Sequence, residues 1–143
     1  MKENRSRYKK NTLMRNKFFK KIIARSSDDL QFISAYCSNS SVKINNIKYL
    51  KKNKIFLILL ERVNQDKKNQ KISSILKFEF IDSSKSKNIN QKDDKILLKL
   101  IAIKLFKVKK NYEITLLFSN NAIINLSAEI IEATLEDLKQ IND

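Results

Sequence analysis

The sequence contains no glycine, proline, histidine or tryptophan, and it has a single cysteine. Without histidine or a second cysteine, the common zinc sites and the Ser-His-Asp and Cys-His triads cannot be built. Without glycine, the phosphate-binding loops of the Walker and dinucleotide types are also excluded. A single cysteine rules out an intramolecular disulfide framework and is typical of a reducing compartment. We therefore expect a cytoplasmic protein that holds no metal or cofactor.

Carboxylates, lysines and tyrosines are the groups that remain for acid–base chemistry, and the spacing of the carboxylates does not argue for a catalytic site. Glu61 and Arg62 end an apolar segment, where a salt-bridged strand end is a simpler interpretation than a catalytic pair. Asp93 and Asp94 lie in a lysine-rich stretch and balance its charge. Cys37 has no histidine to act as its base, so we interpret it as a small apolar residue on a helix face. We expect no enzymatic activity, and a carboxylate-based enzyme is the third alternative for function.

Positive charge is concentrated at the start of the chain. The formal net charge is +15, and residues 1–21 carry nine basic side chains against one acid. This composition predicts a basic, disordered arm over residues 1–17, of a kind that can bind phosphate backbones non-specifically. No apolar segment follows the charges, so the arm does not resemble a secretory signal. The residues that we expect to make any contact with nucleic acid are Lys2, Arg5, Arg7, Lys9, Lys10, Arg15 and Lys17.

The excess of lysine has a second explanation. Lysine, asparagine and isoleucine abound while residues with GC-rich codons are missing, which is typical of an AT-rich coding sequence. A polyanionic partner and codon drift therefore both remain open. The same bias means that turns must use asparagine where other proteins use glycine, because asparagine tolerates positive φ next best.

The longest apolar run, residues 95–106 (KILLKLIAIKLF), is predicted to be the central strand of the fold. Only Lys99 and Lys104 interrupt its apolar residues, which fits a strand that is buried on both faces at its middle. A helix is the alternative, but the isoleucine content and the alternation of neighbouring segments favour a strand. A membrane span is excluded because it would need about 20 apolar residues.

The remaining segments predict one helix and several strands. Residues Ser26-Ser27-Asp28-Asp29 are typical of a helix start, with a serine cap and acids in the first turn, and the apolar spacing extends the helix over residues 27–38. Besides the central run, strands are predicted at residues 18–24, 42–45, 47–50, 54–63, 71–81, 112–118 and 122–131. After a strand end near Ala133, residues 132–138 are ambiguous, and we expect a short helical turn there.

Polar pairs and stretches mark the connections. Asn45 and Asn46 predict a tight turn between two short strands, and residues 51–53, 107–111 and 119–121 predict further turns. Residues 64–70 are polar and predict a loop. Residues 82–94 (DSSKSKNINQKDD) form the longest internal polar stretch, which we interpret as an exposed, mobile loop.

Together these segments predict an α+β domain built mainly of antiparallel sheet. We expect seven or eight strands in a curled sheet or partly open barrel, with one N-terminal helix packed on it. The domain should span residues 18–138, with a frayed end at residues 139–143.

Short motifs follow one another in a fixed order, beginning with Asp28-Asp29-Leu30 and Ser34-Ala35 and ending with Ile131-Glu132-Ala133. In this order they resemble a family of small bacterial proteins typical of alphaproteobacteria, domain of unknown function 2948. The resemblance covers residues 21–138 and leaves out the arm. Glu61 stands where the family's "LLLNR" strand commonly has asparagine. The matching segments are Asp28-Asp29-Leu30, Ser34-Ala35, Val42-Lys43, residues 54–62, Ile75-Leu76-Lys77-Phe78 (family "LRF"), residues 100–106 (family "LLAIRF") and Ile131-Glu132-Ala133 with Leu135 and Asp137-Leu138 (family "IEA-x-L-x-DL").

This chain also departs from the family pattern. The family's glycine-rich turn is Ser119-Asn120-Asn121 here, and the tryptophan and proline residues common near its loops and C-terminus are missing. The resemblance implies one compact intracellular domain. It supplies no activity, cofactor or catalytic residues.

Two functions remain after these exclusions. The first is a non-enzymatic binding or scaffold domain that presents a sheet edge or face to another protein, because unpaired strand edges recruit partners readily. The second is a nucleic-acid or ribosome-associated protein that uses the arm and loop lysines. Tyr49, flanked by Lys48, Lys51 and Lys52, is the nearest approach to the interleaved aromatic and basic residues of a single-strand binder.

Overall fold

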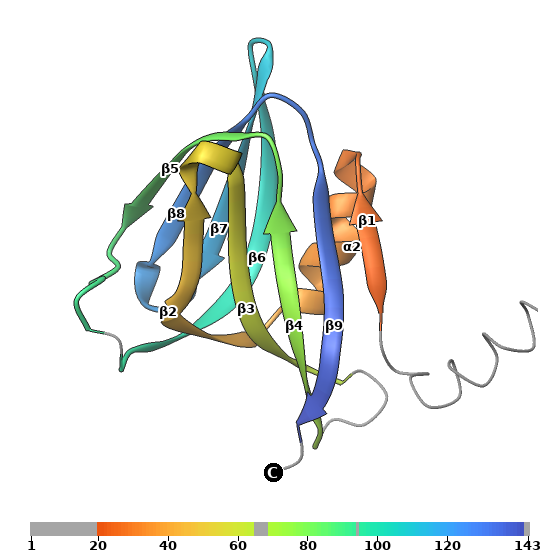
Figure 1. The fold of residues 1–143 in the computed structure, drawn as a ribbon, viewed down its shortest axis with the longest axis vertical. Helices are drawn as coiled ribbons and strands as arrows, with labels where there is room; N and C mark the ends of the chain where they lie inside the picture. Colours follow the sequence, from red (N-terminus) through yellow and green to blue (C-terminus); the bar gives the residue numbers. More distant parts are fainter. Residues whose placement is uncertain (1–19, 65–68, 94, 142–143) are drawn as a thin grey trace, which may run out of the picture.

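The computed structural model of the chain describes residues 20–64, 69–93 and 95–141, so the predicted arm at residues 1–17 lies outside the described residues. This part contains nine strands, one α-helix and two short 3₁₀ turns (Figure 1). The elements are β1 (Lys21–Ala24), α2 (Ser27–Cys37), β2 (Ser40–Leu50), η1 (Lys51–Asn53), β3 (Ile55–Val63), β4 (Lys71–Phe78), β5 (Ile81–Lys87), β6 (Leu97–Val108), β7 (Asn111–Phe118), η2 (Ser119–Asn121), β8 (Ile123–Ala128) and β9 (Ala133–Ile141).

All nine strands belong to one sheet, in the order β1-β9-β4-β3-β2-β6-β7-β8-β5. Every pairing is antiparallel. Among the described residues, β1 and β5 stand at opposite ends of the strand order and do not pair, so the sheet curls without closing. The predicted mainly antiparallel, open sheet with one helix is confirmed. The predicted number of seven or eight strands is too low.

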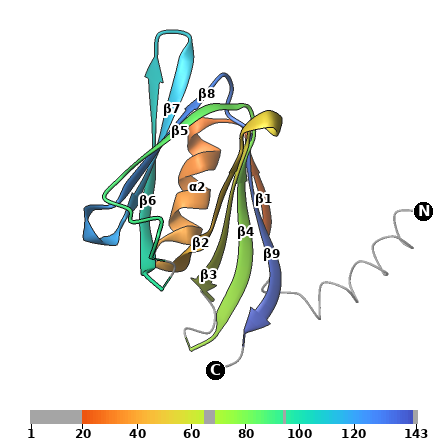
Figure 2. The ribbon, with the colours of Figure 1, turned by 60° about the vertical axis from the view of Figure 1, so that its left-hand side comes forward.

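Strand β2 joins the two halves of the curled sheet. Its first residues pair with β6 over Ser40–Lys43, while its length also pairs with β3. Beyond this junction the five-stranded half (β1, β9, β4, β3, β2) and the four-stranded half (β6, β7, β8, β5) diverge (Figure 2).

Helix α2 lies between the two halves and packs against strands of both (Figure 2). Ser26 caps it by accepting a hydrogen bond from the backbone N–H of Asp29 at 3.2 Å. Leu30, Ile33 and Cys37 are fully or almost fully buried on its inner face, as the sequence predicted. The structure gives the helix as Ser27–Cys37, within one residue of the prediction.

The central strand is confirmed at β6, but its predicted burial on both faces is wrong. Leu98 and Leu100 point into the core, whereas Leu97 and Ile101 are 54% and 48% exposed. The reason is that helix α2 covers only the inner surface of the curl, so the outer surface faces solvent. The apolar residues on that surface hid the alternation that a one-sided strand normally shows.

The predicted turn at Asn45-Asn46 is wrong, because β2 is one continuous strand from Ser40 to Leu50. Its pairing with β3 shifts between Val42 and Ile47, where extra residues are taken up as a bulge. A bulge bends a strand without reversing it, and the asparagine pair fits the bend as well as it fits a turn.

The predicted loop at residues 82–94 is also partly wrong. Its first part forms β5, which pairs with β8 from Ile81 to Lys87. The predicted strand at residues 71–81 ends earlier, at Phe78, and the chain turns at Phe80, which has φ of 60°. Serine and lysine have little intrinsic preference for strands, so pairing with β8 decides the conformation of β5.

The predicted helical turn at residues 132–138 is replaced by strand β9. This strand pairs with β4 on one side and with β1 on the other. It continues to Ile141, beyond Leu138, where we expected the domain to end. Ladder bonds on both sides outweigh the modest helix preference of its alanine, glutamate and lysine residues.

The predicted turns at residues 51–53 and 119–121 are confirmed. Asn120 and Asn121 both have φ of 61°, so asparagine indeed takes the role of glycine. Lys109 adopts φ of 57° in the two-residue connection between β6 and β7, where a side chain with Cβ is strained.

We predict that Lys109→Gly stabilises the protein by about 0.5–1 kcal/mol, because glycine removes the Cβ strain at positive φ. The matched control is Lys110→Gly, which removes the same charge from the neighbouring residue of the same turn. The control should be neutral or slightly destabilising. Urea unfolding of both variants measures the difference, and equal stabilities would contradict the strain at Lys109.

Candidate functional site

A cleft of about 420 Å³ opens between β2 and β5, on the side of the curl that helix α2 does not fill. Three parts of the chain form its walls: the second half of β2, the inner side of β5, and the connection from β5 to β6. The lining residues are Ile44, Asn45, Ile47, Lys48, Tyr49, Phe56, Ser84, Ser86, Ile89, Gln91 and Ile124.

Two strand edges face this cleft. Beyond Lys43, β2 pairs only with β3, so the edge of residues 44–50 that leads toward the cleft is in no described ladder. Strand β5 pairs only with β8, which leaves its other edge outside the described ladders as well. An unpaired strand edge presents backbone N–H and C=O groups in a row that can accept another strand.

Helix α2 covers the unpaired edge of β6 on the other side of the junction between β2 and β6. Strand β6 also leaves β2 after Leu100, and there the side-chain hydroxyl of Ser34 accepts a hydrogen bond from the backbone N–H of Ile103 at 2.9 Å. The helix thus covers and partly satisfies that strand edge. No described element does the same between β2 and β5.

One end of the cleft is fixed by hydrogen bonds. The Tyr49 hydroxyl donates to the carbonyl oxygen of Ile81, and the Ile81 N–H donates to the carbonyl oxygen of Lys54, both at 2.9 Å. The Lys54 ammonium group also bonds to Asp82 at 3.1 Å and Glu129 at 3.2 Å, and these bonds raise the pKa of Lys54. The junction holds β2 and β5 in place at this end.

The floor of the cleft is apolar and buried. Ile44, Phe56 and Ile124 are buried beneath it, and the Phe56 ring packs at 6.5 Å from the Tyr49 ring. Side chains on β5 and the following connection supply a polar rim, where the Gln91 amide donates to the Ser86 hydroxyl at 3.4 Å. An apolar floor with a few polar groups at the rim is typical of a binding site.

The titratable side chains of the lining are Lys48 and Tyr49. It contains no aspartate, glutamate or cysteine, so no carboxylate pair converges in this cleft. Across the described ranges 20–64, 69–93 and 95–141, histidine, cysteine, aspartate and glutamate also form no group of three that could hold a metal ion. The cleft thus combines two strand edges and an apolar floor with a lining that holds no carboxylate.

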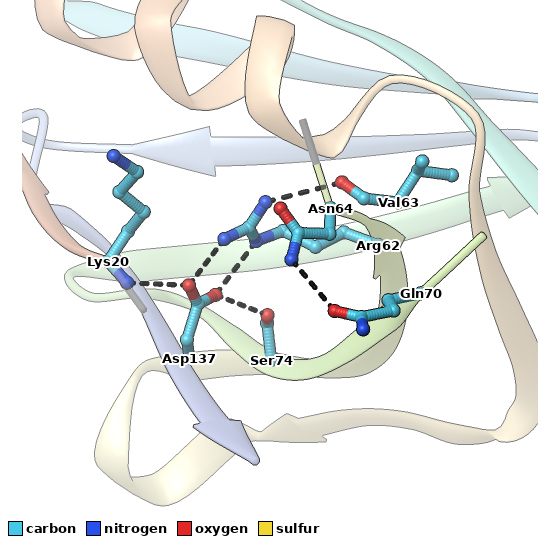
Figure 3. A network of polar contacts seen from close by, with 7 residues as sticks. All are labelled: Lys20, Arg62, Val63, Asn64, Gln70, Ser74 and Asp137. Atoms are coloured by element: carbon cyan, nitrogen blue, oxygen red, sulfur yellow. Dashed lines mark hydrogen bonds and ion pairs between the residues drawn. The ribbon is translucent and has the colours of Figure 1, made fainter. Parts of the chain in front are cut away.

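A second polar cluster lies away from the cleft, in the interior between β3, β4 and β9 (Figure 3). The guanidinium group of Arg62 donates two hydrogen bonds to Asp137, at 2.8 Å from Nε and 2.5 Å from Nη2. The carboxylate of Asp137 also accepts from the Ser74 hydroxyl and from the backbone N–H of Lys20, both at 2.6 Å. The side chains of Arg62 and Asp137 are 1% and 0% exposed.

This cluster is structural, because solvent cannot reach it. Asp137 lies on β9 where the pairing of β4 and β9 shifts between Ser73 and Ser74. Its hydrogen bonds connect β9 to β3, to β4 and to the residue that precedes β1. The Arg62 guanidinium also lies 5.6 Å from the centre of the Tyr36 ring on helix α2. A bidentate, fully bonded pair of this kind can be tolerated in a low-dielectric interior.

The expected salt bridge at Arg62 therefore exists, but its partner is Asp137. Asp137 was not predicted as this partner, because the alanine, glutamate and lysine residues around it favour a helical turn at residues 132–138. Interpreted as a strand, Leu135 and Asp137 share one face with a period of two, and an acid there must be buried with a partner.

Cys37 is fully buried on the inner face of helix α2, as predicted. Burial raises the pKa of its thiol from 9.0 to about 12, with Arg62 opposing this shift and Asp137 adding to it. The protonated thiol is inert as a nucleophile at neutral pH.

The residues expected to contact nucleic acid, Lys2 to Lys17, all lie outside the described residues. Tyr49 is half-buried and turned into the cleft, so it is not an exposed stacking platform. The described lysines occur on both halves of the sheet, as Lys77 on β4 and Lys104 on β6 illustrate. Within the described residues, no helix is long and apolar enough to cross a membrane.

We predict that Arg62→Met destabilises the fold by about 3–5 kcal/mol, because it leaves the Asp137 carboxylate buried without its cation. The double variant Arg62→Met with Asp137→Leu should recover most of this loss. As an exposed control, Lys77→Met breaks the 3.8 Å pair with Glu79 and should cost under about 1 kcal/mol. Urea unfolding measures all three, and a loss below about 1 kcal/mol for Arg62→Met would refute the structural role of the pair.

We also predict that the folded protein resists thiol labelling at pH 8.5. A pKa raised from 9.0 to about 12 lowers the thiolate fraction roughly a thousandfold, and the rate should rise only as the pH approaches 12. Urea-unfolded protein should react at the rate of a free thiol. Equal rates for folded and unfolded protein, measured with a chromogenic disulfide reagent, would show that Cys37 is accessible.

Comparison with known proteins places these features in a family. A solved structure titled as an uncharacterized protein from Neisseria gonorrhoeae is similar, with 22% sequence identity, a TM-score of 0.43, and coverage of 67% of this chain and 90% of that chain. No curated protein matches the chain. The family model for proteins of unknown function DUF2948 matches residues 20–142, which include both the cleft and the buried cluster. The chain belongs to the DUF2948 family.

Proposed function

We propose that this protein is a non-enzymatic binding domain that takes an extended segment of a partner protein into the cleft between β2 and β5. The observation that carries the proposal is the pair of strand edges that face one another across the cleft. A strand placed there would bond to β2, to β5 or to both, and would bridge the gap in the curled sheet.

The shape and chemistry of the cleft support this proposal. Residues 44–50 of β2 span roughly 20 Å at about 3.3 Å per residue, which is room for six or seven residues of an extended chain. Every second side chain of such a segment would point toward the buried floor of Ile44, Phe56 and Ile124. The apolar floor and the open strand edges support the binding of a peptide segment.

A fixed end makes the site ready for binding. The bonds of Ile81 to Tyr49 and Lys54 hold both strand edges before a partner arrives. A preformed groove loses less conformational entropy on binding than one that must be ordered. The single buried cysteine is consistent with a reducing compartment, and we place the protein and its partner in the cytoplasm as part of this proposal.

We predict that Ser86→Trp abolishes binding, because Ser86 lines the cleft and an indole there would occupy the space of the partner. Ser83→Trp is the matched control, since Ser83 is on the same strand but pairs with Ser127 on the outer surface. Both variants should fold, and both keep the charge unchanged.

Peptides selected from a displayed library against the wild-type protein provide the ligand for this test. Selected peptides should slow amide hydrogen exchange in residues 44–50 and 83–87, and should bind Ser83→Trp but not Ser86→Trp. Failure to select any peptide, or protection confined to other strands, would overturn the proposed site.

A further inference from the structure

We propose that the segment bound in the cleft alternates apolar and acidic side chains, with the acidic ones facing outward. This inference rests on the proposed function and names the class of partner. It follows from which side chains of β2 and β5 lie on the inner surface and which lie on the outer surface.

The inner positions select apolar side chains. On β2, Ile47 pairs with the buried Ile58, and Tyr49 pairs with the buried Phe56. On β5, Ser86 pairs with the buried Ile124. A strand inserted between them would direct every second side chain over this apolar floor, where a charged group would be desolvated without a partner.

The outer positions carry positive charge on both sides of the cleft. Lys48 lies at the rim of the cleft, and its pairing with Leu57, between the inner residues Ile47 and Tyr49, places its exposed side chain on the outer surface of β2. Lys85 and Lys87 alternate with Ser84 and Ser86 and are exposed on the outer surface of β5. An inserted strand would therefore have a lysine on one neighbour and two lysines on the other.

Negative charge is nearly absent from these two edges. Strand β2 contains no acid, and the only acid of β5, Asp82, is already ion-paired with Lys54 at 3.1 Å. Side chains opposite one another on neighbouring strands are about 4.5–5.5 Å apart at Cβ, so opposite charges attract and like charges repel. The outward side chains of the partner are thus favoured when acidic and disfavoured when basic.

The test compares three labelled seven-residue peptides that share the same apolar residues at alternate positions. Their other positions hold glutamate, glutamine or lysine. Fluorescence anisotropy with the full-length protein should show the glutamate peptide binding about tenfold more tightly than the glutamine peptide, with the lysine peptide weakest. The difference should shrink as salt screens these exposed charges.

Variants of the protein locate the effect. Lys48→Gln combined with Lys85→Gln should remove most of the preference for glutamate over glutamine. Lys104→Gln is the control, because Lys104 lies on the same outer surface but at β6, the far side of the four-stranded half from β5. The control should retain the preference in full.

The outcomes separate this inference from the proposed function. If the glutamate and glutamine peptides bind equally and both protect residues 44–50, the charge preference is wrong and the peptide site stands. If no peptide binds and none protects the cleft, both are wrong. If a single-stranded oligonucleotide displaces the glutamate peptide and protects the same amides, the cleft recognises polyanions and the inference is overturned.

Discussion

The bend in strand β2 is the constraint on which the rest of the fold depends. The strand pairs with β3 over most of its length, but it pairs with β6 only from Ser40 to Lys43. One strand thus belongs to two halves of a sheet that twist apart, and the curl cannot close. The divergence creates two openings, one filled by helix α2 and the other left as a cleft.

The buried ion pair between Arg62 and Asp137 connects the short strand β1 to the centre of the five-stranded half of the sheet. Strand β1 is only four residues long and pairs with β9 alone, so it would fray easily. Asp137 bonds to the backbone of Lys20 just before this strand and to Arg62 on β3, which links the edge to the centre of the sheet. Because an unpaired charge in the interior is costly, the pair also specifies the register of β9 against β4.

The buried polar groups and the proposed binding cleft are separated in space. The titratable groups with buried environments, Cys37 and the Arg62–Asp137 pair, lie under helix α2 and between strands that solvent does not reach. The cleft between β2 and β5 has the opposite character, with an apolar floor, open backbone edges and exposed lysines on the two strands that border it. Buried polar groups away from a cleft maintain a fold, whereas accessible strand edges recruit a partner.

The sequence by itself determined the class of the fold, the helix from Ser27, the turn at Ser119–Asn121 and the strand character of residues 97–106, because each depends on local spacing and capping. Only the tertiary structure decided the continuity of β2, the strands β5 and β9, and the burial of Asp137. Serine-rich β5 and helix-prone β9 become strands because β8, β4 and β1 supply ladder partners that are distant in sequence. The cleft could not be predicted for the same reason. It forms where the edges of β2 and β5 face one another, and no local sequence pattern connects these two strands.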